Sequence, residues 1–252
     1  MKIHRITYVL LGLVLIAVTI SVTTQKGRVQ NSSLRQPKSQ DKRGQQTEDY
    51  KKHFPIAEFD EQEPSDPQKQ ATFHTKKARH NKGVLVFKNP DPDIGGGGFY
   101  PERQFEFPAL PTGLSDVIVL GEVLEAQAHL SEDKSNVYSE FTIRVAKAFK
   151  SRGDLPAQIT VERLGGWVKY PDGRKLIYLF GSANMPRVGG KYLLFLKYIP
   201  QSEDLTILTG YEFGPTGVSP LDPSGQFEAY RGISENSFFL DLNNALAKPS
   251  NK

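Results

Sequence analysis

The sequence predicts a mainly β domain, a small five-stranded barrel with a C-terminal helix, preceded by a transmembrane helix and a disordered tether. Three observations predict this architecture. An uncharged apolar run lies near the N-terminus, polar chain follows it, and short alternating apolar segments separated by turn residues then recur almost to the C-terminus. We therefore expect an anchor over residues 1–24, a tether over 25–105 and a folded domain over 106–248.

The apolar run, residues 6–22, has the length and the flanks of a membrane anchor. At about 1.5 Å per residue, a helix of this length just spans a hydrocarbon core of about 30 Å. Lys2 and Arg5 favour a cytoplasmic N-terminus, whereas Lys26 and Arg28 oppose that orientation by the positive-inside rule. We expect a single-pass protein of the cytoplasmic (inner) membrane with the C-terminal domain outside. If the segment is instead a cleaved signal peptide, the protein is secreted.

The predicted tether is rich in Gln, Lys, Ser and Pro, and it has too few large apolar side chains to offset the conformational entropy of folding. An alternative for the stretch from Phe54 to Phe59 is a segment that folds on a partner. Residues 1–105 carry 17 Lys+Arg and 11 Asp+Glu, whereas residues 106–248 carry 14 and 17. The net charge of +4 therefore describes the tether, and the acidic domain argues against a nucleic-acid partner.

The domain is predicted from a series of strand patterns. Phe141 and Ile143 lie on one side of such a strand and Thr142 and Arg144 on the other, which is the alternation of a half-buried strand. Gly165-Gly166 interrupts the series, and Ser234 is a suitable N-cap for a final helix. We expect strands over 116–129, 137–150, 158–163, 167–170, 176–180, 188–196 and 205–213, and a helix over 234–247.

The succession "SDVIVLGEVLEA", "EFTIRVAKAFK", "ITVERLGG", "VGGKYLLFL" and "LTGYEF", within about residues 113–221, resembles a known module. It is similar to the OB-fold modules related to the netrin-like domain and the tissue inhibitors of metalloproteinases, and to bacterial envelope proteins with the same frame. The resemblance implies an OB-like barrel. Those inhibitors bind the protease metal through an N-terminal cysteine, and this chain contains no cysteine, so that mechanism does not carry over.

Arg163, Trp167, Tyr170 and Tyr178 form the candidate binding group. They surround the glycine interruption, and aromatic rings beside an arginine could stack on bases or sugars. Packing in the core or at the barrel rim is the alternative. We expect no metal site and no cofactor, because His129 is the one histidine in the domain and is expected at the surface.

Glu122, Glu125 and Glu140 are the candidate catalytic carboxylates, since they could approach one another across the first hairpin. Exposed strand glutamates without a catalytic role are the alternative. The sequence therefore predicts a non-catalytic extracytoplasmic binding module, held to the membrane through residues 6–22, whose partner is an envelope protein or a glycan. The alternatives are a peptidase inhibitor, on the resemblance alone, and an envelope enzyme that uses these glutamates.

Overall fold

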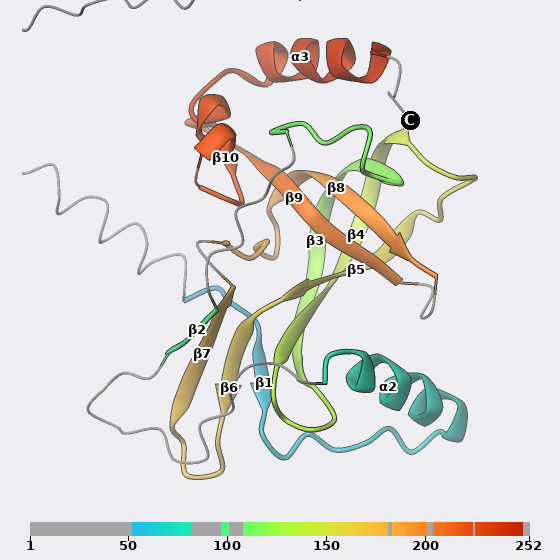
Figure 1. Cartoon of the computed structure of the whole chain (residues 1–252), viewed down its shortest axis with the longest axis vertical. Helices are drawn as coiled ribbons and strands as arrows, with labels where there is room; N and C mark the ends of the chain where they lie inside the picture. Colours follow the sequence, from blue (N-terminus) through green and yellow to red (C-terminus); the bar gives the residue numbers. More distant parts are fainter. Residues whose placement is uncertain are drawn as a thin grey trace, which may run out of the picture. The chain divides into compact units, whose positions relative to one another are not determined.

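Two β-sheets organise the part of the chain that the structure describes (Figure 1). In this computed structural model the described residues are 52–81, 97–100, 108–180, 183–200, 204–223 and 225–248. All of them belong to one unit, Gln40–Lys252. The fold is mainly β with a C-terminal helix, as the sequence predicts.

The larger sheet has the strand order β10-β9-β5-β4-β3-β8, and β8 also pairs with β9. Five strands, β3, β4, β5, β9 and β8, therefore pair in a closed cycle. Neighbours in this cycle are antiparallel except β5 and β9, which are parallel. The six strands of this sheet are β3 (Val117–Leu130), β4 (Val137–Lys150), β5 (Gln158–Leu164), β8 (Lys191–Ile199), β9 (Asp204–Gly214) and β10 (Gly217–Pro220). The predicted long first hairpin is confirmed as β3–β4.

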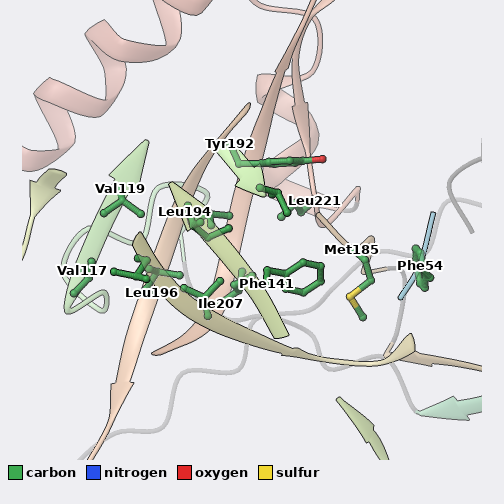
Figure 2. Packing of buried hydrophobic residues seen from close by; sticks show 14 of the residues in the cluster. Phe54, Val117, Val119, Phe141, Met185, Tyr192, Leu194, Leu196, Ile207 and Leu221 are labelled. Carbon is green, nitrogen blue, oxygen red and sulfur yellow. The ribbon is translucent and has the colours of Figure 1, made fainter. Parts of the chain in front are cut away.

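The main apolar core lies between strands of this cycle. Figure 2 shows Phe141 of β4, Leu194 and Leu196 of β8 and Ile207 of β9 among the packed side chains. Strand β8 is apolar on both faces, because Leu193 and its neighbours on the other face belong to a second cluster. This explains the continuous apolar run that the sequence shows at this strand.

The second cluster packs the C-terminal helix α3 (Glu235–Ala247) and the 3-10 helix η1 (Gly225–Tyr230) against β8 and β9. Phe238 and Leu242 are the buried side chains of α3, and they lie one helical turn apart. The hydroxyl of Ser234 accepts a hydrogen bond from the Ser237 N–H at 3.2 Å, which confirms the predicted N-cap.

The smaller sheet is built on the hairpin of β6 (Gly166–Lys169) and β7 (Lys175–Phe180), whose two strands flank a turn at Pro171–Gly173. Two short strands from the region before the domain complete it. They are β1 (Ile56–Glu58), parallel to β6, and β2 (Gly97–Tyr100), parallel to β7. The chain before residue 106 therefore contributes both outer strands of this sheet.

The prediction that residues 25–105 form a tether without regular structure is wrong for residues 97–100, which form β2, and for residues 52–81. They contain β1 and the helix α2 (Pro67–Arg79), which begins at the N-cap Asp66. Phe54 and Ala57 are buried by the domain, at 4% and 1% exposure. The apolar contacts of this segment, at Phe54, Ala57 and Phe59, are too few to give a periodic pattern, and the contacts of α2 are mainly polar. For the stretch from Phe54 to Phe59, the alternative of a segment that folds on a partner fits better, with the chain's own domain as the partner.

The predicted anchor, residues 1–24, lies outside the described residues, and so does the rest of the tether apart from 52–81 and 97–100. Within the described ranges, no helix has both the length and the apolar composition needed to cross a bilayer.

Candidate functional site

The predicted binding group does not form one open surface. Arg163 on β5 is 6% exposed, and its guanidinium pairs with Asp222. Trp167 on β6 is half-buried against the main core. Tyr178 on β7 is buried, and Tyr170 at the end of β6 stacks on Phe59 with ring centroids 4.9 Å apart. Packing, the alternative that the sequence left open, describes these positions.

The Arg163–Asp222 pair is a buried structural contact. Asp222 is 1% exposed, and its second carboxylate oxygen accepts a hydrogen bond of 2.8 Å from the hydroxyl of the buried Thr209. The pair therefore ties β5 to β9 and to the segment that follows β10. Its side chains are held inside the domain, so they do not offer a charge to a ligand.

Two of the three candidate catalytic glutamates, Glu122 and Glu140, are separated along the first hairpin. Glu122 lies opposite Arg144, with which it forms an ion pair, whereas Glu140 lies opposite Gln127, five residues further along β3. At about 3.3 Å per residue, Glu122 and Glu140 are roughly 16 Å apart along the strands. They cannot act on one substrate atom together.

His129 is a correction to the sequence analysis, which placed it at the surface. It is 8% exposed, its Nδ1 lies 2.6 Å from Glu61 Oε1, and its Nε2 lies 3.7 Å from Glu140 Oε2. Glu61 comes from the docked segment 52–81, 68 residues away in sequence. No local sequence pattern around His129 indicates that Glu61 is its partner, so the contact could not be predicted from the sequence.

A network of charged side chains surrounds His129 where α2 meets the β3–β4 hairpin and β5. Lys76 Nζ contacts Glu140 at 2.8 Å and Asp204 at 3.1 Å, and Arg79 contacts Asp204 at 2.8 Å and also pairs with Glu162. The rings of His80 and Tyr138 stack with centroids 4.1 Å apart. We call Glu140, Glu162 and Asp204 the acidic face.

Three pKa shifts follow from this network. Burial alone raises the pKa of Glu61, but the hydrogen bond and charge of His129, together with Lys77, outweigh burial and hold that pKa below its usual value. Burial alone lowers the pKa of Lys76, but Glu140 and Asp204 outweigh it and raise that pKa. The pKa of the Tyr138 phenol is raised by burial and by neighbouring carboxylates. All three groups therefore hold their usual charge state at neutral pH.

A groove of about 530 Å³ lies on the opposite side of β5 from β4. Its floor is apolar, with Val117, Leu155, Ile159 and Leu205, and its rim is polar. Such a volume is in the range of natural ligand sites. The rim includes Arg152, Asp154, Gln158, Thr160, Tyr198 and Asp204. We call this site the β5 groove.

Among the described residues, no strand pairs with the first part of β5 on the side of this groove. The pairing of β5 with β9 begins only at Val161 opposite Leu205, so the first residues of β5 lack that neighbour among the described residues. On the other side, Ala157 O accepts from Val145 N at 2.9 Å and Gly165 N donates to Val137 O at 2.8 Å. The backbone N–H and C=O groups of the odd-numbered residues of β5 therefore point toward β4.

The backbone N–H and C=O groups of successive residues point to opposite sides along a strand. Those of the even-numbered residues of β5 therefore point away from β4. The register between β4 and β5 has no bulge over this stretch. Both backbone groups of Gln158 and the N–H of Thr160 consequently point to the β5 groove. The site thus combines an apolar floor with hydrogen-bonding groups of an open strand edge.

A second hollow, of about 420 Å³, lies beside β1 and β6. Its charged side chains already have partners: Lys169 contacts Glu58 at 3.0 Å and Lys77 contacts Glu61 at 3.1 Å. Within the described ranges, no cluster of three or more His, Asp or Glu side chains could hold a metal ion. This leaves the β5 groove as the better candidate site.

Comparisons with protein-family models, with curated proteins and with solved structures find no match to this chain.

Proposed function

We propose that this chain is a membrane-anchored, extracytoplasmic, non-catalytic binding module that takes an extended peptide into the β5 groove. The observation that carries the proposal is the open edge of β5 above an apolar floor. An extended peptide satisfies such an edge by pairing with it as an added strand, and its alternate side chains then reach the floor.

The framework that presents the groove is proposed to be an OB-like barrel. The closed cycle β3-β4-β5-β9-β8 and the parallel contact between β5 and β9 support this proposal. In a fully paired barrel no strand has a free edge. Here no described strand pairs with the first part of β5 on the side of the groove, which would give the barrel a place for a further strand.

Chemistry of the groove supports a peptide over a nucleic acid. One arginine and two aspartates border it, and Asp204 already pairs with Lys76 and Arg79. Nucleic-acid sites depend on several cations that contact phosphates. The proposed location, outside the cytoplasmic membrane on the anchor at residues 6–22, makes an envelope protein the natural source of the peptide.

The proposal is tested by selecting peptides from a random library displayed on phage against the full-length chain in detergent. We expect the selected peptides to be extended and to carry an apolar residue for the floor. Thr160→Pro removes the N–H that faces the groove and leaves the bonds to β4, so it should weaken binding by about tenfold or more. Thr160→Val keeps the N–H and should bind as the parent does. Equal binding by both variants, or no selected peptide, contradicts the proposal.

A further inference from the structure

Helix α2 is docked on the domain in an unusual way, because none of its residues is buried. The C-terminal helix α3, in contrast, buries Phe238 and Leu242. The strand that precedes α2 is also held by apolar side chains, since Phe54 and Ala57 are buried. The hydrophobic effect therefore fixes α3 and β1, but it contributes little to the position of α2.

Ion pairs take the place of apolar packing at α2. Lys76 and Arg79 contact the acidic face at 2.8–3.1 Å, and Arg79 makes a further pair with Glu162. Lys77 contacts Glu61 at 3.1 Å, and His74 lies 3.5 Å from both Glu63 and Glu132. Phe73 is the single large apolar side chain of the helix. It contacts the His129 ring in a T-shaped arrangement with centroids 6.3 Å apart, and it also contacts His74 and Lys77 of its own helix.

The surface under α2 is itself polar. Glu162, His129 and Tyr138 are 4%, 8% and 1% exposed in the docked state, and each carries a group that water can hydrogen-bond. Lifting α2 would therefore replace protein contacts by water contacts without exposing the apolar core. The β3–β4 hairpin and β5 keep their own ladders in that state, because α2 contributes no strand to them.

We propose that α2 is a lid over the acidic face, held by ion pairs, which opens as ionic strength rises while the sheets stay folded. Screening supplies the mechanism, since the Debye length falls from about 10 Å at 0.1 M salt to about 3 Å at 1 M. Apolar contacts do not weaken in this way. The lid responds to salt, whereas α3, on the opposite end of the β3–β4 hairpin in Figure 1, does not. This inference goes beyond the proposed function and uses a different surface.

Hydrogen exchange measured by mass spectrometry on the full-length chain tests the lid. Between about 0.05 and 1 M sodium chloride, we expect exchange of the α2 amides to rise by about tenfold, since several contacts weaken together. Amides of β3, β4 and α3 should keep their rates. Exchange of α2 that does not change with salt, or that rises only together with β3 and β4, overturns the proposal.

Two variants sharpen the test. Lys76→Gln with Arg79→Gln should give fast α2 exchange already at low salt, because the contacts to the acidic face are gone. Lys69→Gln is the matched control, since Lys69 is exposed on the same helix. A control as fast as the double variant overturns the proposal, because general loss of charge would then explain the change. A double variant that fails to fold also overturns it, since α2 would then be part of the framework.

Discussion

Replacing Asp222 by asparagine should strongly destabilise the domain, because it leaves the charge of Arg163 buried without a counter-charge. Asp222 and Arg163 are 1% and 6% exposed, and Thr209, which donates to the same carboxylate, is fully buried. Breaking a buried pair by removing one partner costs about 3–5 kcal/mol. With an m-value of about 2–3 kcal/mol/M, this corresponds to a fall of roughly 1–2 M in the urea midpoint.

Fluorescence of Trp167 during urea unfolding of the full-length chain measures this effect. Trp167 is the single tryptophan of the chain and is half-buried in the domain, so the predicted anchor and tether do not contribute to the signal. Glu122→Gln is the control. It removes the ion pair of two largely exposed side chains, Glu122 and Arg144, and should change stability by less than about 1 kcal/mol.

A second substitution decides whether the buried charge is the cause. Arg163→Met added to Asp222→Asn removes the uncompensated charge and should restore much of the lost stability. If Asp222→Asn costs no more than the exposed control, the reasoning about the buried pair is refuted. The same holds if the double variant is less stable than Asp222→Asn alone.

Three further predictions concern the backbone and pH. Gly166→Ala should lower the free energy of unfolding by about 1–3 kcal/mol, because the φ of Gly166 is +142° and a Cβ would lie 2.9 Å from the hydroxyl of Ser139. Gly153 has open space around it, so Gly153→Ala should have little effect in the same urea titration. The pKa of Glu61 is lowered in the folded chain. Its contribution to the free energy of unfolding is therefore present above the unfolded pKa of about 4.3 and is lost as pH falls through the lowered pKa. The free energy of unfolding measured from pH 5 to 3 should fall less in Glu61→Gln than in the parent. Burial raises the pKa of Tyr192 to about 12, so its stabilising contribution should be lost as pH rises from about 10, and the difference in phenolate absorbance between the parent and Tyr192→Phe should titrate near 12.

Local pattern was enough to predict seven strands of the domain, but it missed the short strand β10. Alternation at Phe141 and Ile143 and the apolar run at Leu193–Leu196 follow directly from which faces are buried. Helix α2 was missed because its contacts are charged and its apolar residues show no period. Asp66 followed by Pro67, an N-cap and a first-turn proline, was the one available signal of its start.

The polar contacts could not be predicted, because each joins residues that are distant in sequence. Asp222 pairs with Arg163 across 59 residues and Glu61 contacts His129 across 68. An arginine near aromatic residues looks the same in sequence whether it is exposed to a ligand or buried with a carboxylate. The β5 groove was missed for a related reason: among the described residues, the pairing of β5 with β9 begins only at Val161, and no local sequence pattern shows this.

The open edge of β5 is tested most directly by residue-resolved hydrogen exchange on the full-length chain without a ligand. The backbone N–H groups of Ile159 and Val161 point toward β4, so they should be protected from exchange. The N–H of Thr160 between them points to the groove and should exchange far faster. Addition of a selected peptide should then protect Thr160. Protection of Thr160 equal to that of its two neighbours in the free protein would contradict the account.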